Sequence, residues 1–105
     1  YCEFNLSPSE RWNAYDFAAR RDGMAERPIP REPVCTMRMG SSFAIFDAAL
    51  PAAALPDTDC ALGLTCVIEE AGGHKSFWAL EHRGEQPDFH DPACFTARLA
   101  APSGA

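Results

Sequence analysis

Two glycines in the second half of the chain restrict its fold more than any other feature. Gly72 and Gly73 separate Leu64–Ile68 from Phe77–Leu80, and both flanking runs are rich in the apolar, β-branched and aromatic residues that strands favour. Two such runs around a short glycine-containing connection predict a β-hairpin. A chain with this hairpin needs a sheet face to bury, so an all-β fold is the first expectation.

The pairing register of this hairpin follows from where the turn closes. If residues 71–74 form the turn, Glu70 lies opposite Lys75, Ile68 opposite Phe77, and Cys66 opposite Ala79. This register predicts one apolar, buried face. It also predicts a mixed aromatic and polar face formed by Thr65, Val67, Glu69, Ser76, Trp78, Leu80 and His82.

Two more hairpins are predicted nearer the N-terminus. Alternation over residues 1–6, turn chemistry over residues 7–10 and a returning run over residues 12–17 indicate the first hairpin. The second alternates Cys35, Met37 and Met39 with polar residues, turns at Gly40 and returns over residues 43–46, and its methionines are expected in the core.

The remaining segments predict connections and one last strand. Residues 20–33 are charged and proline-containing, which indicates a surface loop. A helical turn is expected to start near Pro51, and residues 95–99 alternate like a final strand. We therefore predict an antiparallel β-sandwich of the immunoglobulin-like or jelly-roll-like kind over residues 1–100, followed by a disordered tail over residues 101–105. Because the first residues already alternate like a strand, we expect the sandwich to be incomplete at its N-terminus.

Composition narrows the classes of partner. The chain has 105 residues and a net charge of −6, with nine Lys and Arg scattered among fifteen Asp and Glu, so a nucleic-acid partner is not expected. No run approaches the roughly 18 to 20 apolar residues that cross a bilayer, so no membrane partner is expected. Five cysteines without a C-x-x-C pair predict reduced, buried thiols, which favours the cytoplasm.

Two terminal segments resemble a known family. Residues 1–8 read Y-C-E-F-N-L-S-P, residues 78–82 read W-A-L-E-H, and residues 87–92 read P-D-F-H-D-P. These strings resemble the DOMON-like domains of bacteria, which are related to the type 9 carbohydrate-binding modules and carry Y-x-E-F-N-x-S-P and W-A-L-x-H…P-D-F-H-x-P. The resemblance implies a non-catalytic sandwich that binds a small molecule, with a carbohydrate as the expected ligand.

A sugar site needs an aromatic plate and nearby groups that bind hydroxyls. The candidate plate is Trp78, with Glu69 and His82 expected on the same hairpin face. Further candidate ligand-binding residues are Glu3 and Asn5 on the first strand, together with Trp12 as the second tryptophan. No catalytic residue, metal ligand or cofactor is predicted.

Two alternatives belong to other classes. Other DOMON relatives bind haem through methionine and histidine, and the possible ligands here are Met24, Met37, Met39, His74, His82 and His90. Such a domain would transfer electrons. The second alternative is a structural or protein-interaction module without a small-molecule ligand. The segment around His90 could also form part of a metal-binding site or an acid–base catalytic site. We favour a rigid connection in which Asp88 or Asp91 binds backbone amides.

Overall fold

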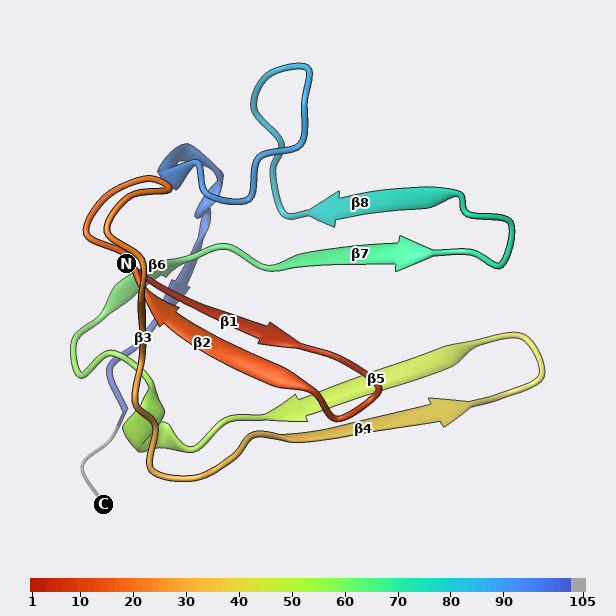
Figure 1. Cartoon of the computed structure of the whole chain (residues 1–105), viewed down its shortest axis with the longest axis horizontal. Coiled ribbons are helices and arrows are strands. Elements are labelled where there is room, and N and C mark those ends of the chain that lie inside the picture. Colours follow the sequence, from red (N-terminus) through yellow and green to blue (C-terminus); the bar gives the residue numbers. More distant parts are fainter. Residues whose placement is uncertain (103–105) are drawn as a thin grey trace. The chain divides into compact units, whose positions relative to one another are not determined.

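The computed structural model describes residues 1–102, and their regular structure consists of antiparallel strands and two short 3-10 turns (Figure 1). The predicted all-β, antiparallel class is therefore confirmed. The strands are β1 (Cys2–Leu6), β2 (Trp12–Asp16), β3 (Ala25–Glu26), β4 (Val34–Met39), β5 (Ala44–Ala49), β6 (Cys60–Leu62), β7 (Thr65–Glu69), β8 (Lys75–Ala79) and β9 (Ala97–Leu99); the 3-10 turns are η1 (Ala52–Ala54) and η2 (Pro92–Cys94).

The described residues form two compact units, which meet in sequence between Asp57 and Thr58. Each unit is described by itself. The stacking of the strands as a sandwich and the single domain over residues 1–100 stay predictions.

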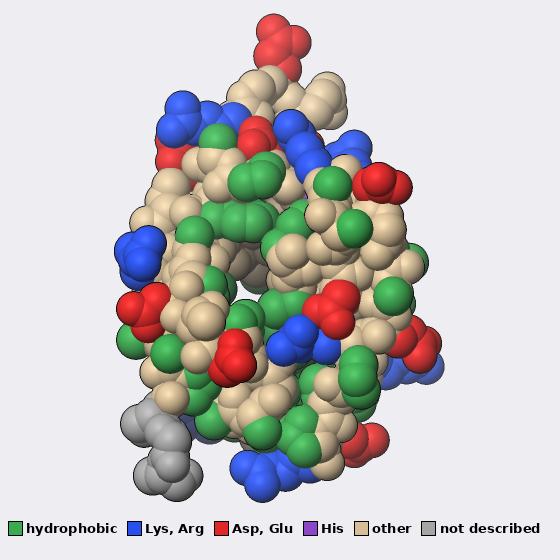
Figure 2. All heavy atoms as spheres, turned by 90° about the vertical axis from the view of Figure 1, so that its left-hand side faces the viewer, with side chains coloured by type: hydrophobic (Ala, Val, Ile, Leu, Met, Phe, Trp, Pro, Cys, Tyr) green, Lys and Arg blue, Asp and Glu red, His purple; other side chains and the backbone are tan. Residues whose placement is uncertain are grey.

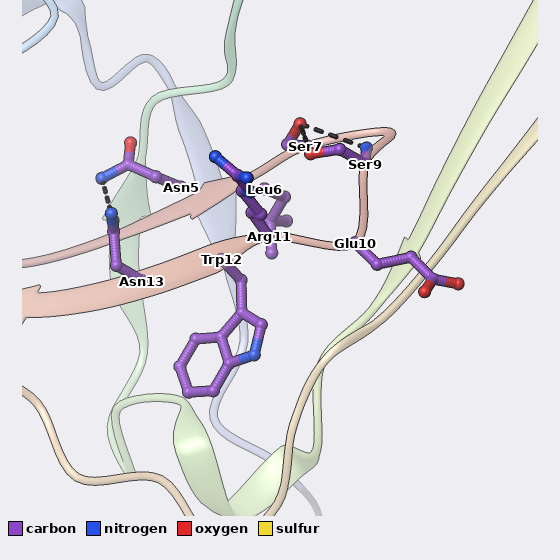
Figure 3. A pocket seen from close by; sticks show the side chains of 8 residues that line it. All are labelled: Asn5, Leu6, Ser7, Ser9, Glu10, Arg11, Trp12 and Asn13. Carbon is purple, nitrogen blue, oxygen red and sulfur yellow. Dashed lines mark hydrogen bonds between the residues drawn. The ribbon is translucent and has the colours of Figure 1, made fainter.

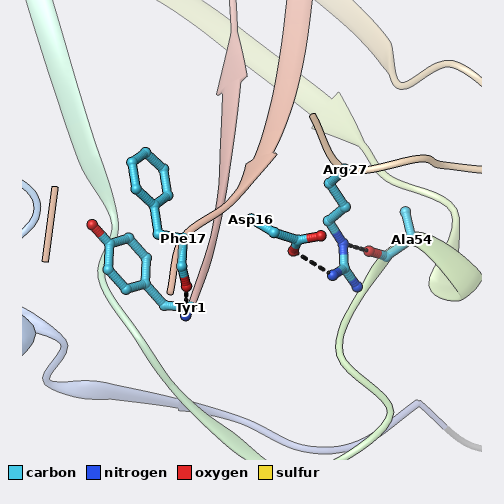
Figure 4. A network of polar contacts seen from close by, with 5 residues as sticks. All are labelled: Tyr1, Asp16, Phe17, Arg27 and Ala54. Carbon is cyan, nitrogen blue, oxygen red and sulfur yellow. Dashed lines mark hydrogen bonds and ion pairs between the residues drawn. The ribbon is translucent and has the colours of Figure 1, made fainter. Parts of the chain in front are cut away.

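In the first unit, β1, β2 and β3 form one antiparallel sheet. The predicted first hairpin is present, with Leu6 opposite Trp12. The ladder continues beyond the two strands, because the N-terminal amine donates to the Phe17 carbonyl oxygen at 2.9 Å and the Phe17 amide donates to the Tyr1 carbonyl oxygen at 2.7 Å. The Tyr1 and Phe17 rings stack with centroids 4.9 Å apart (Figure 4). Phe17 and Ala14 are buried, and the other buried apolar residues of this unit are Cys35 in β4 and Ala54 in η1.

The turn of this hairpin places a glutamate in an unusual backbone conformation. The Glu10 amide donates to the Ser7 carbonyl oxygen at 3.1 Å, which closes a four-residue turn. Glu10 then has φ +66°. Hairpin loops with a residue of positive φ after such a turn favour glycine at that position, since an L side chain is strained there.

The predicted surface loop over residues 20–33 contains a short strand. β3 pairs with β2, with Glu26 opposite Tyr15. Arg27 follows β3 directly and contacts both β2 and η1. Its Nη1 lies 2.8 Å from Asp16 Oδ1, and its Nε donates to the Ala54 carbonyl oxygen at 2.9 Å (Figure 4). The hydrogen bond to Asp16 raises the pKa of the Arg27 guanidinium above its usual value. A loop prediction based on prolines misses this strand because only two residues of it pair.

Arg27 thereby connects β2 to η1, which begins after Pro51 as the sequence predicts. Ala54 in η1 is almost completely buried. The Arg27 guanidinium donates to the Ala54 carbonyl oxygen, so this buried backbone group has a hydrogen-bond partner.

The second predicted hairpin is also present, formed by β4 and β5 with Cys35 opposite Ala48. Cys35 is buried, but the expectation that both methionines fill the core is wrong. Met37 is 42% exposed and Met39 is 76% exposed. Alternation correctly placed Cys35, Met37 and Met39 on one face of β4. Only the part of this face near Cys35 is covered in the structure, and the methionines lie nearer the turn of the hairpin, where the face is exposed.

In the second unit, β6 pairs with β9, and β7 pairs with β8. The predicted last strand is confirmed as β9. Its partner β6 was not predicted, because Cys60, Ala61 and Leu62 are all apolar and show no alternation with polar residues. The Ala101 amide donates to Asp59 Oδ1 at 2.7 Å. Of the predicted tail, residues 103–105 lie outside the described residues.

The glycine hairpin exists, but its predicted register is wrong by one residue. Lys75 lies opposite Glu69 rather than Glu70, and Phe77 lies opposite Val67 rather than Ile68. The loop explains the difference. The Gly73 amide donates to the Glu70 carbonyl oxygen and the Glu70 amide donates to the His74 carbonyl oxygen, both at 2.8 Å, so residues 71–73 form a three-residue loop. Gly73 has φ +86°, which is the loop geometry that ends on a glycine of positive φ.

This shift reverses the faces that the register assigned to β7. Cys66 lies opposite Trp78 instead of Ala79. Ile68 and Phe77, which were expected to be buried, are 47% and 44% exposed. A slip of one residue moves every side chain of one strand to the other face relative to its partner.

The thiols are only partly buried. Cys35 and Cys94 are buried as expected, whereas Cys2 and Cys60 are half-buried and Cys66 is exposed, and none of the five cysteines forms a disulfide. Figure 2 shows that both basic and acidic side chains reach the surface of the face it draws. Residues 1–102 include no helix with the length and apolar character of a membrane span.

Candidate functional site

The indole of Trp78 is the most exposed aromatic surface in the hairpin of β7 and β8. Its side chain is 59% exposed, and its Nε1–H donates to Ser76 Oγ at 2.9 Å. Ser76 precedes it by two residues, so both side chains lie on the same face of β8. The hydrogen bond fixes the orientation of the ring while leaving the ring surface accessible.

The observed register decides which polar groups share this face. Glu70 and His74 form the pair that closes the loop, and they alternate in phase with Ser76 and Trp78. Glu70 and His74 are thus the carboxylate and imidazole on the Trp78 face, and both are exposed. The register predicted from the sequence did not place Glu70 and His74 on this face, because it assumed a loop of four residues. The signal that could have found them is Gly73, whose position suits the last residue of a three-residue loop.

Glu69 and His82 do not join Trp78. Glu69 lies opposite Lys75, on the other face of the hairpin. His82 follows β8, and its Nε2 lies 3.1 Å from the Phe77 carbonyl oxygen while its ring lies 6.2 Å, between centroids, from the ring of Phe89. Phe77 and Phe89 are themselves neighbours, at 6.3 Å. The expected common face of Trp78, Glu69 and His82 is therefore wrong.

The first hairpin brings two of the predicted residues together and adds others. Asn5 Nδ2 donates to Glu3 Oε1 at 2.7 Å and to Asn13 Oδ1 at 2.7 Å. Asn13 is the direct cross-strand partner of Asn5, and Arg11 lies two residues before it (Figure 3). We call Asn5, Asn13 and Arg11 the amide–arginine face. Asn13 and Arg11 were not predicted, although pairing Leu6 with Trp12 in the sequence would have placed them here.

A surface concavity of about 730 Å³ surrounds the tip of this hairpin. Its lining includes the amide–arginine face, and the complete set is Asn5, Leu6, Ser7, Ser9, Glu10, Arg11, Trp12 and Asn13. Figure 3 shows Trp12 on the opposite side of the ribbon from the two asparagines. Trp12 also lines a smaller concavity of about 200 Å³ beside Tyr15 and Arg27. The side chains of the predicted residues Trp12 and Asn5 therefore lie on different sides of the hairpin.

In the segment around His90, Asp88 and Asp91 both bind backbone amides, as expected. Asp88 Oδ1 accepts from the His90 amide at 3.0 Å, and Asp91 Oδ1 accepts from the Ala93 amide at 3.0 Å. The second bond caps η2 at its start. Within residues 1–102, no group of three or more His, Cys, Asp or Glu side chains is placed to hold a metal ion.

No family model, no curated protein and no solved structure matches this chain. The DOMON-like resemblance of the terminal segments thus stays a prediction, and the geometry of the two hairpins is the basis for a proposed function.

Proposed function

We propose that this chain is a non-catalytic binding module that takes a carbohydrate on the Trp78 face of the β7–β8 hairpin. One observation carries the proposal: an exposed indole is held in a fixed orientation by Ser76 on an exposed strand face. A flat ring that is already oriented loses little rotamer freedom when a ligand stacks on it. The apolar face of a pyranose is a suitable partner for such a ring.

Polar groups on the same face extend the proposed site along the strand. Alternate residues of a strand lie about 6.6 Å apart, so Trp78 and His74 are separated by about 13 Å. Ser76 Oγ lies between them, and Glu70 lies across from His74. A hydroxyl group of a sugar can donate to the carboxylate and accept from the imidazole N–H. This spacing suits an oligosaccharide better than a single ring.

Calorimetry with mono- and disaccharides tests the proposal. Trp78→Ala is expected to abolish measurable binding, because loss of a stacked aromatic at the centre of a site costs about 2 kcal/mol or more. Ser76→Ala keeps the ring but frees its orientation, so a smaller loss is expected. Val67→Ala on the opposite face is the matched control and should leave affinity unchanged. Tight sugar binding by the Trp78→Ala variant would contradict the proposal.

An interaction module is the second candidate, and the exposed apolar side chains of the same hairpin favour it. Leu64, Ile68 and Leu80 accompany Trp78, and together they form more exposed apolar surface than a sugar requires. This candidate predicts no affinity for any saccharide. The haem alternative predicts a Soret band in the absorbance spectrum after haem is added.

A further inference from the structure

We propose that the amide–arginine face of the first hairpin is a second binding site, separate from Trp78, and that it takes the carboxylate-bearing residue of an acidic saccharide, a uronic acid. Arg11 binds the carboxylate, and the two asparagines bind ring hydroxyls. The proposal depends on three features of the hairpin: the fixed orientation of the amides, the open charge of Arg11, and the concavity that surrounds them.

The two amides hold each other in one orientation. Asn5 Nδ2 uses its two hydrogens on Glu3 Oε1 and Asn13 Oδ1, each at 2.7 Å. Among the described residues, Asn5 Oδ1 and Asn13 Nδ2 then keep no partner of their own, so they present one acceptor and one donor group to a ligand. A sugar hydroxyl both donates and accepts, and a fixed acceptor beside a fixed donor matches two neighbouring hydroxyls.

Arg11 supplies the charge. Its side chain is exposed and forms no ion pair within residues 1–102. Figure 3 shows its guanidinium on the side of the two asparagines, whereas Glu10 points away from them. A guanidinium binds a carboxylate through two parallel hydrogen bonds, which gives both strength and orientation.

The surrounding charges select the class of ligand. The chain carries a net charge of −6, and Glu3 belongs to the same strand face as the amides. A ligand with several negative charges is repelled, while a ligand with one carboxylate can place it at Arg11, away from Glu3. Ser7 and Ser9 at the rim of the 730 Å³ concavity provide further hydroxyl contacts. A singly charged sugar acid fits this pattern of one cation, two amides and two hydroxyls.

Titration of the full chain with glucuronate and galacturonate, which carry one carboxylate each, and with neutral glucose and glucose oligomers, tests the proposal. Wild type is expected to bind the uronate, with an affinity that falls as salt is added. Arg11→Gln should lower that affinity about tenfold or more, because a charge-assisted bidentate contact is lost. Arg11→Lys keeps the charge but loses the fork, so an intermediate affinity is expected. Asn13→Asp puts a carboxylate in place of the donor amide and should also weaken uronate binding.

The controls separate this site from the proposed Trp78 site. Arg31→Gln makes the same change in net charge at another exposed arginine and should leave uronate affinity unchanged. Trp78→Ala should remove neutral-sugar binding but spare the Arg11-dependent uronate binding. The inference is overturned if wild type binds no uronate, if Arg31→Gln weakens it as much as Arg11→Gln, or if Trp78→Ala abolishes it. Failure of the Trp78 proposal alone would appear only with the neutral sugars.

Discussion

Replacement of Glu10 by glycine is expected to stabilise the first hairpin. Glu10 has φ +66°, and its side chain is exposed, so the substitution removes strain without removing buried area. An L residue in the left-handed region costs roughly 1–2 kcal/mol, which glycine avoids. Glycine in turn adds unfolded-state entropy worth about 0.4–1 kcal/mol. The difference predicts a gain of about 0.5–1 kcal/mol, which corresponds to a rise in Tm of roughly 2–6 °C for a domain of this size.

Thermal and urea unfolding of three variants would isolate the cause of this gain. Glu10→Ala removes the carboxylate but keeps the backbone strain, so it should show little or no stabilisation. Ser9→Gly adds a glycine one residue earlier, where φ is not positive, and should destabilise by about 0.4–1 kcal/mol. The reasoning is refuted if Glu10→Gly is no more stable than Glu10→Ala.

Three further predictions concern packing, a thiol and an arginine. Gly63→Ala should destabilise the second unit by about 1–3 kcal/mol, because an added Cβ would lie 2.8 Å from the Phe95 ring. Gly72→Ala is the control and should not destabilise it, because its Cβ would meet nothing within 4 Å. Urea unfolding of both variants measures the difference. Cys66 is exposed, so mass spectrometry after brief iodoacetamide treatment should find it modified before the buried Cys35. Arg27→Met should lower the free energy of unfolding by about 1–3 kcal/mol, since a partly buried charged contact and a carbonyl partner are lost. The pKa of Arg27 is raised, so its contribution is complete while the guanidinium is charged in both the folded and the unfolded state, and it is lost only when the pH rises through that pKa. The difference in free energy of unfolding between wild type and variant should therefore stay constant from pH 6 to 9 in urea unfolding.

The sequence identifies the hairpins because alternation and turn residues are local properties. Residues 1–17, 34–49 and 64–80 contain enough consecutive strand residues for a period of two to be visible. β3 and β6 have two and three residues, and strands of that length exist only because a partner strand is present. β9 also has three residues, but its alternation extends back to Phe95, whereas β3 and β6 show no such pattern.

The candidate site was harder to predict because it depends on a single loop residue. Whether His74 belongs to the loop or to the strand determines if Glu69 or Glu70 shares a face with Trp78. The exposure of Met37 and Met39 shows a second limit: alternation tells which residues share a face, but it does not tell whether anything covers that face.

Each compact unit contains one of the chain's two tryptophans, Trp12 in the first and Trp78 in the second. The emission of a Trp12→Phe variant would come from the second unit alone, and that of a Trp78→Phe variant from the first. Denaturation midpoints from these two fluorescence signals would coincide if the units unfold cooperatively and would separate if they unfold independently.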